Sequence, residues 1–388
     1  MCRIENMKLT QLYKEFFNSE KAGGIVLVAM TIISLALANS QLQITYVEFW
    51  NFELAGHSII HWIDDGLMTI FFLLIGLELE REIYNGELSN PKNATLPIFA
   101  AIGGMLVPAG IYLLINFRTG TLSGAGIPMA TDIAFALGFL SLLGKRVPAS
   151  LKIFLTALAV IDDLGAIIII SLFYSSALSL SNLAFAIGIF CLLILFNRLR
   201  IYNLLPYIIG GVLMWYFMSL SGIHPTITGV LIAFTIPFSD GGERSPSYRL
   251  QHLLHKPVAF IILPLFALAN TGIVIDYNLI EGLKQNYSLG IISGLAIGKP
   301  LGIFIFSLLC IKFGIGVLPA ELKWGNIIGA GFLGGVGFTM SIFIDLLAFD
   351  LPYMIETAKM AILSGSLIAG LTGIVILRLT LGKNIGDN

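Results

Sequence analysis

The strongest constraint on this chain is the repetition of apolar segments that are about as long as a bilayer is thick. An α-helix needs roughly 20 apolar residues to cross the hydrocarbon core. Windows of about this length lie at 24–39, 61–80, 95–116, 127–143, 150–174, 182–197, 203–219, 222–238, 257–275, 288–311, 325–347 and 357–380. Because lipid cannot satisfy exposed backbone polar groups, such segments form helices. The sequence therefore predicts an all-α polytopic membrane protein with about twelve transmembrane helices.

The composition agrees with a membrane bundle and excludes other classes. Hydrophobic residues make up 57% of the 388 residues and charged residues only 12%, whereas soluble proteins carry roughly a quarter charged residues. The net charge of −1 gives no reason to expect a nucleic-acid partner. Cys2, Cys191 and Cys310 are scattered, without disulfide or metal spacing, and we expect no cofactor. One membrane domain over 1–388 is the simplest organisation.

Two segments outside the apolar windows have a character of their own. Residues 1–23 are polar and lack the apolar stretch of a signal peptide, so we expect a cytoplasmic or interfacial segment, with Met7 as an alternative start. Helical spacing of apolar side chains there suggests a short amphipathic helix at the interface, through Leu9, Leu12, Tyr13, Phe16 and Phe17. Between the first two windows, "QITYVEFWNFELAGHSI" alternates loosely and predicts a small hairpin.

Lysine and arginine residues predict the orientation. Placing both termini in the cytoplasm puts 18 of the 22 basic residues in segments on that side. Only Arg118, Lys284 and Lys359 then belong to the outer side or to helix ends, and Lys299 lies inside a window. Cytoplasmic loops carry such an excess of basic residues. The sequence therefore predicts a multi-pass protein with both termini cytoplasmic.

Sorting the charged residues by depth leaves four that lie clearly within the membrane, away from the window ends: Asp132, Asp162, Asp163 and Lys299. A charge at the bilayer centre costs roughly 3 kcal/mol even on insertion scales, and such residues usually mark ion pathways. A structural ion pair is the alternative. Neighbouring residues on a helix point about 100° apart, so Asp162 and Asp163 cannot both face one partner. The set suits a cation that binds carboxylate oxygens and is then released.

Glycine and proline interrupt two of the windows. Gly124, Gly126 and Pro128 precede Asp132, and 329–337 contains five glycines. Small residues alone could mean close helix packing, but the two segments occupy the middle of two comparable triplets, 95–174 and 288–380. Interrupted helices at matching positions predict inverted repeats with two broken, crossing helices. Asp132 and Lys299 have the charges needed to offset the partial charges at helix ends within the membrane.

The chain resembles the NhaA family of bacterial sodium/proton antiporters. The resemblance runs from about Phe16 to Arg378 and rests on "FFLLIGLELERE", "AAIGGMLVPA", "ATDIAFALG", "LKIFLTALAVIDDLGAIIII", "LPLFALANTGI", "IGKPLGI" and "GGVGFTMSIF". It implies an electrogenic, pH-regulated antiporter that expels Na+ or Li+ in exchange for inward protons. It also implies a homodimer in the bacterial cytoplasmic (inner) membrane, surrounded by lipid.

The resemblance also implies roles for individual residues. It places cation and proton binding on Asp162 and Asp163, with Thr131 and Asp132 at the helix crossing, Lys299 near the pair and Gly337 in the second broken helix. Positions tied to pH response map to Glu78, Arg81, Glu82, His224, His252 and His255. Solvated helix ends and ordinary interfacial histidines are the alternatives for those six. Gln251 stands where the family has an acid, and Glu80 where a basic residue is usual.

The same residues bear on other possible functions. Exchange of another monovalent cation for protons is the nearest alternative. An intramembrane aspartyl protease also uses two buried carboxylates, but "VIDDLG" lacks a GxGD context, and no HExxH, GxSxG or P-loop occurs. No segment resembles a channel filter. The sequence therefore predicts a secondary active transporter rather than an enzyme.

Overall fold

The computed structural model describes residues 20–174, 178–239 and 241–381. The amphipathic helix expected between Leu9 and Phe17 lies outside these ranges. The first part of the chain forms α2 (Glu20–Ala38), α3 (Gln43–Asn51), strands β1 (Glu53–Leu54) and β2 (His57–Ser58), α4 (Ile59–His61), α5 (Met68–Tyr84), α6 (Pro91–Ile115), α7 (Ile133–Ser141) and α8 (Ala149–Phe173).

The rest of the chain is also helical, and several helices contain irregular turns. Its helices are α9 (Leu180–Arg198), α10 (Leu205–Ser219), α11 (Ile227–Ala233), α12 (Pro246–Pro257), α13 (Leu263–Asn270), α14 (Tyr277–Gly282), α15 (Asn286–Ser293), α16 (Lys299–Lys312), α17 (Trp324–Gly334), α18 (Phe338–Ala348) and α19 (Pro352–Thr380). The 3-10 helices are η2 (Glu87–Ser89), η3 (Leu122–Met129) and η4 (Gly144–Arg146), and the π-helical turns are η1 (Trp62–Leu67), η5 (Val258–Ile262) and η6 (Gly294–Gly298).

This is an all-helical polytopic membrane protein. In the described residues, eight helices are long and apolar enough to cross a membrane, or up to ten when each bent pair counts as one span. The windows at 203–219 and 222–238 hold the shorter helices α10 and α11. Pro225 and Pro237 flank α11, and proline cannot donate a backbone hydrogen bond, which limits this helix to seven residues.

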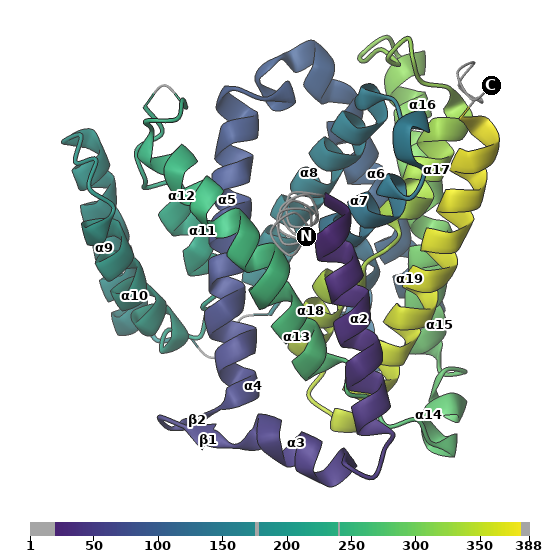
Figure 1. The fold of residues 1–388 in the computed structure, drawn as a ribbon, viewed down its shortest axis with the longest axis horizontal. Coiled ribbons are helices and arrows are strands. Elements are labelled where there is room, and N and C mark those ends of the chain that lie inside the picture. The colour runs from purple at the N-terminus through teal and green to yellow at the C-terminus, as the bar shows by residue number, and fades with distance from the viewer. Residues whose placement is uncertain (1–19, 175–177, 240, 382–388) are drawn as a thin grey trace, which may run out of the picture.

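The helices form one bundle with two recognisable ends (Figure 1). At one end, drawn at the bottom, lie α3, α14 and the β1–β2 hairpin, and we call this end the hairpin face. The predicted hairpin is confirmed at Glu53–Ser58, where Gly56 occupies the left-handed region with φ +86°. The residues before it form helix α3 instead of a strand. The C-terminal end of α19 lies at the opposite face.

Two parts of the bundle differ in how they pack. Helices α9 and α10 pair at one edge of the bundle, and α11 fills the space against α5. The other part packs α6 against α16 and α17 against α19. Between them lies the largest apolar core, which includes Phe72, Phe266 and Phe343. This arrangement surrounds the two interrupted segments with helices on both sides.

Glycine permits the closest contact in the bundle, between α6 and α16. A Cβ built on Gly103 would meet the backbone oxygen of Gly302 and the ring of Phe306. A Cβ on Gly302 would meet the backbone of Gly103 in turn. The backbones of the two helices therefore approach each other as small residues allow in membrane proteins.

Replacing Gly103 by alanine should separate α6 from α16. We expect Gly103→Ala to lower the stability of the folded protein by about 1–3 kcal/mol, the usual range for overpacking, measured as a lower melting temperature in detergent. Gly110→Ala in the same helix is the matched control, because a Cβ there has open space around it. Equal melting temperatures for the two variants would contradict the close-contact interpretation.

Candidate functional site

Two interrupted helical segments meet inside the bundle. The chain is extended between η3 and α7, and α17 and α18 are bent by 46° at their break. The backbone N–H of Asp132 donates to the carbonyl of Val336 at 2.7 Å, and Ser341 Oγ donates to the carbonyl of Ile127 at 2.7 Å. In addition, η3 packs on α18 and α7 packs on α17. The two breaks therefore lie against each other, where the broken segments cross.

The carboxylate of Asp132 lies at the N-termini of two half-helices. It caps α7 by accepting the N–H of Phe135 at 3.0 Å. It also accepts the N–H of Thr339 in α18 at 3.1 Å and the Thr339 hydroxyl. Helix N-termini carry partial positive charge. One buried carboxylate thus serves both N-termini at the crossing.

Lys299 joins a carboxylate to the opposite kind of helix end. Its Nζ lies 2.7 Å from Asp162 Oδ2, and both side chains are fully buried. The same Nζ donates to the carbonyl of Met129, the last residue of η3, where the partial charge is negative. The π-helical turn η6 ends directly before Lys299, and such turns are frequent at functional sites. The ammonium group therefore contacts negative charge on two sides.

Thr131 completes the contacts of Asp162. Its hydroxyl oxygen lies 2.7 Å from Asp162 Oδ2 and 2.8 Å from the carbonyl of Gly334. One hydroxyl proton can be donated to either acceptor. Asp162 Oδ1 has no hydrogen-bond partner among the described residues. Asp162 is therefore paired through one oxygen and has the other available.

Asp163 is buried and unpaired. It is 3% exposed, and within the described ranges no ion pair or hydrogen bond reaches its carboxylate. Asp162, Asp132 and Glu78 are near enough to interact with it electrostatically, as is Lys299. A buried carboxylate without a partner is strongly disfavoured unless a proton or a cation neutralises it. The adjacent carboxylates therefore differ: Asp162 is paired with lysine, and Asp163 has no positive partner among the described residues.

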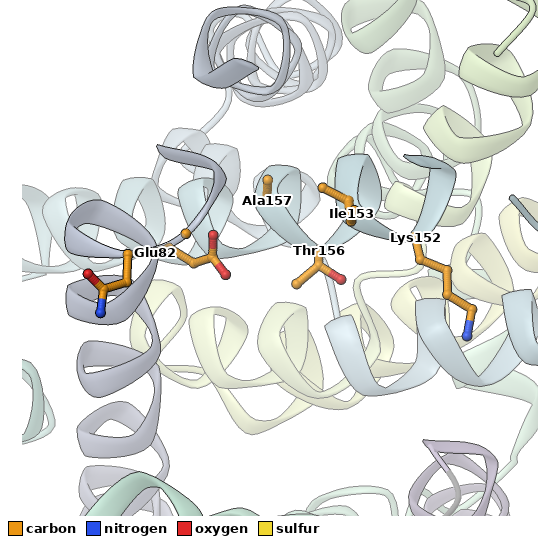
Figure 2. A pocket seen from close by; sticks show the side chains of 7 residues that line it. Glu82, Lys152, Ile153, Thr156 and Ala157 are labelled. Carbon is orange, nitrogen blue, oxygen red and sulfur yellow. The ribbon is translucent and has the colours of Figure 1, made fainter. Parts of the chain in front are cut away.

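A cavity lies beside α8 at the face opposite the hairpin. It has a volume of about 420 Å³ and lies between the end of α5 and the first turns of α8 (Figure 2). Its lining residues are Glu82, Asn85, Gly86, Lys152, Ile153, Thr156 and Ala157. Ala157 precedes Asp162 by five residues, about 7.5 Å of helix rise. Helix α8 therefore carries the carboxylates a short distance beyond the cavity.

The residues mapped to pH response fall into two groups. Arg81, at the end of α5, lies 5.6 Å above the ring of Tyr248 in α12. The Tyr248 ring stacks on His252 at 6.1 Å. Glu80, the residue that departs from the family pattern, is buried and accepts a hydrogen bond from Ser247 at 2.9 Å. Polar contacts thus join the ends of α5 and α12, with Glu78 and Glu82 on α5 and Gln251 and His255 on α12.

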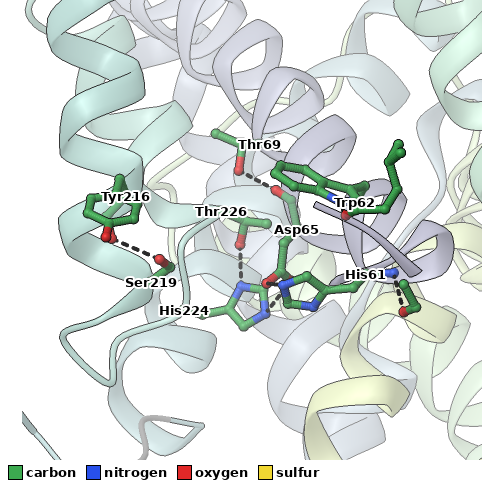
Figure 3. Close-up of polar contacts among 10 residues, drawn as sticks. His61, Trp62, Asp65, Thr69, Tyr216, Ser219, His224 and Thr226 are labelled. Atoms are coloured by element: carbon green, nitrogen blue, oxygen red, sulfur yellow. Dashed lines mark hydrogen bonds and ion pairs between the residues drawn. The ribbon is translucent and has the colours of Figure 1, made fainter. Parts of the chain in front are cut away.

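His224 belongs to a separate group, together with Thr226, Asp65 and His61 (Figure 3). Its Nε2 lies 3.5 Å from Asp65 Oδ1, and its Nδ1 lies 2.7 Å from the hydroxyl of Thr226. His61 Nε2 lies 3.5 Å from the other oxygen of Asp65. The structure therefore does not bring His224 together with His252. Gly337 lies at the second break, directly before α18.

Sequence reasoning missed a second group of buried charges. Asp345, inside the window 325–347, was not counted among the intramembrane acids, yet it is fully buried in α18. Lys359 was assigned to the outer side or a helix end, and it is 8% exposed. Both residues lie near window ends, where sequence cannot show which neighbours cover them. An acid within "SIFIDLLAF" was the available signal.

The chain was compared with known proteins. The family model described as Na+/H+ antiporter 1 matches residues 14–377. The Na(+)/H(+) antiporter NhaA 1 of Flavobacterium johnsoniae is 63% identical over 380 residues, covering 97% of this chain and 100% of the relative. The Na(+)/H(+) antiporter NhaA of Flavobacterium psychrophilum is 63% identical over 382 residues, covering 98% and 100%. The structure of the sodium proton antiporter MjNhaP1 from Methanocaldococcus jannaschii aligns with a TM-score of 0.49 at 15% identity over 93% of each chain.

The double cap at the crossing makes a prediction about stability. Asp132→Ala removes the acceptor of two helix N-termini and leaves buried N–H groups without partners, at about 1–3 kcal/mol each. Asp276→Ala is the matched control, since Asp276 caps only α14, through the N–H of Leu279 at 2.7 Å, at the hairpin face. We expect the melting temperature in detergent to fall clearly more for Asp132→Ala. A loss no larger than that of the control would show that the carboxylate does not stabilise the crossing.

Proposed function

The chain belongs to the Na+/H+ antiporter 1 family, and from this membership we propose an electrogenic, pH-regulated exchange of outward Na+ for inward H+ at Asp162 and Asp163. The protein is a Na+/H+ antiporter of the NhaA family, a transporter and not an enzyme. One observation carries the assignment of the site. Two adjacent buried carboxylates lie at the crossing of two broken helices, one paired with lysine and one unpaired.

The exchange is a competition for these carboxylates. In the sodium-free state Asp163 holds a proton, and the Lys299 ammonium neutralises Asp162. A small hard cation prefers several oxygen ligands, which Asp163, the free oxygen of Asp162 and the Thr131 hydroxyl can offer. Sodium therefore displaces the proton of Asp163 and takes the place of the ammonium beside Asp162.

The number of charges explains why the exchange is electrogenic. When Na+ replaces Lys299 beside Asp162, the buried amine loses its counter-charge and releases its proton. Asp163 releases a second proton. Two protons then exchange for one sodium ion, so net positive charge moves inward with the protons and the membrane potential contributes to the driving force.

The crossing supplies the element for alternating access. The triplets 95–174 and 288–380 each have a broken middle segment, and we propose that they are inverted repeats within one transport domain, 1–388. Rocking of one group of helices against another around a fixed midplane site opens it to each side in turn. Hydrogen bonds that connect the breaks hold the carboxylates in place during this motion.

The proposal also covers pH response, lithium, assembly and orientation. The contacts between α5 and α12, through Arg81, Tyr248 and Glu80, support a pH-responsive unit beside the cavity. His224 would act from the other side of the molecule, through Asp65. Lithium as a second substrate and a homodimeric assembly rest on the family resemblance. The basic residues support an orientation in the cytoplasmic membrane with both termini inside.

Neutralising either carboxylate should stop exchange. In everted vesicles, we expect Asp163→Asn and Asp162→Asn to reduce the Na+-driven proton signal to that of vesicles lacking the protein. Glu321→Gln, at an exposed acid bonded to Ser150, should leave the signal unchanged. Sodium-driven exchange in the Asp162→Asn/Asp163→Asn double variant would refute the site. An equal wild-type response to K+ would favour a different cation.

Purified protein separates the roles of the two carboxylates. On sodium addition in detergent, the wild type should release protons from both Asp163 and Lys299. Lys299→Gln leaves Asp162 without its cation, so we expect both carboxylates to hold a proton before sodium is added. Sodium should then remove two protonated-acid infrared bands from this variant and one from the wild type. Removal of one band from both proteins would show that Lys299 does not neutralise Asp162.

The orientation is tested by labelling single cysteines in intact cells. In a variant with its native cysteines replaced by serine, Glu53→Cys on the hairpin should react with a membrane-impermeant thiol reagent. Glu321→Cys, in the loop before α17, should react only after the cells are opened. The reverse pattern would place the hairpin face in the cytoplasm.

A further inference from the structure

A second group of buried charges lies apart from the carboxylates of α8. Asp64 in η1, Asp345 in α18 and Lys359 in α19 come from three different elements, and Asn270 at the end of α13 lies among them. Asp345 and Asn270 are at most 1% exposed, and Lys359 is 8% exposed. The exchange proposed above uses none of these residues. We call them the Asp345 centre.

Asn270 connects an acid to the amine in this centre. Its Nδ2 donates to Asp64 Oδ1 at 2.6 Å, and its Oδ1 accepts from Lys359 Nζ at 3.4 Å. The amide therefore lies between a carboxylate and an ammonium group with both of its polar atoms engaged. Electrostatic interactions also reach Lys359 from Asp345, from Asp64 and from Glu356 on its own helix.

Asp345 is the residue of this centre whose carboxylate lacks hydrogen bonds. Neither of its carboxylate oxygens has a hydrogen-bond partner among the described residues, and the side chain is fully buried. Two carboxylates, Asp64 and Asp345, share the single ammonium of Lys359. With all three groups ionised, the centre would hold one uncompensated negative charge in a low-dielectric interior, which is strongly disfavoured. One further positive charge is therefore required.

The surroundings indicate that this charge is a proton. A metal cation prefers several oxygen ligands, whereas the amide oxygen of Asn270 already accepts from Lys359 and Asp64 Oδ1 already accepts from Asn270. A proton needs only one carboxylate oxygen, and both oxygens of Asp345 lack a hydrogen-bond partner among the described residues. The remaining titratable groups that interact with the centre are Tyr112, Tyr174 and Tyr287 around Asp345, Asp65 beside Asp64, and Glu356 beside Lys359. None of these supplies a second cation to the centre.

We propose that Asp64, Asp345 and Lys359, joined through Asn270, form a second proton-binding centre on the route between the hairpin face and Asp162–Asp163. The placement supports a transit site. Asp345 follows Thr339, which binds Asp132, by six residues of α18, about 9 Å of helix rise. On the other side, Asp64 adjoins Asp65, which contacts His61, whose side chain is 41% exposed. The inference rests on the proposed proton exchange.

Infrared titration of the purified full-length protein tests the centre. A protonated carboxylic acid has a C=O stretching band that a carboxylate lacks. Asp345→Asn and Asp64→Asn each leave one carboxylate for Lys359, so each variant should lose one protonated-acid band relative to wild type. Lys359→Met leaves two carboxylates without a cation and should gain one. Asp350→Asn, at an exposed acid just beyond α18, is the matched control and should match wild type.

A transport measurement distinguishes this proposal from the previous one. Asp345→Asn should keep sodium-triggered proton release in detergent, because Asp162 and Asp163 are intact. In proteoliposomes it should lose the wild-type dependence of exchange rate on the pH at the hairpin face. A wild-type spectrum without a protonated-acid band that Asp345→Asn or Asp64→Asn removes would overturn the centre. Absence of sodium-triggered proton release from wild type would instead overturn the exchange mechanism.

Discussion

Charge balance in a low-dielectric interior is the constraint on which this structure depends. Lys299 forms a fully buried ion pair with Asp162, and the neighbouring Asp163 has no such partner. Desolvating a charge costs several kcal/mol unless another charge or a set of hydrogen bonds compensates it. A bundle that buries one more carboxylate than it can neutralise therefore has to bind something positive. In an antiporter this need for a positive charge couples the two ions, because either a proton or a sodium ion can supply the charge.

The interrupted helices make this balance possible without further side-chain charges. Asp132 accepts hydrogen bonds from the N-termini of α7 and α18, so its negative charge is met by backbone dipoles. Lys299 meets the carbonyl end of η3 at Met129 as well as Asp162. Helix ends thus contact Asp132 and the lysine that pairs with Asp162. Within the described residues Asp163 has no such partner, and in the proposed exchange its charge is met by the transported ion.

Much of the site is readable from sequence, since an acid inside a long apolar window and a cluster of glycines are both local signals. The crossing of the two interrupted segments follows from glycine and proline near Asp132 and Gly337. The sequence does not show which carboxylate pairs with Lys299. Asp162 and Asp163 are adjacent, and only the rotation of α8 about its axis decides which one faces the lysine. Asp345 and Lys359 were missed for a related reason: their burial depends on Asp64 and Asn270, which are distant in sequence. The seven-residue length of α11 likewise depends on flanking prolines within an otherwise apolar window.

The two buried centres have one composition in common, two carboxylates for each lysine. In the first, Asp162 and Asp163 share Lys299, and in the second, Asp64 and Asp345 share Lys359. Such a set is neutral with one bound proton. A proton that passes from one centre to the other, deprotonated centre therefore neutralises the acceptor and leaves one negative charge in the donor. Since α18 carries both Thr339, which holds Asp132, and Asp345, movement at the crossing changes the position of the second centre as well. In the proposed mechanism, ion binding at the first centre and proton access through the second are therefore linked through one helix.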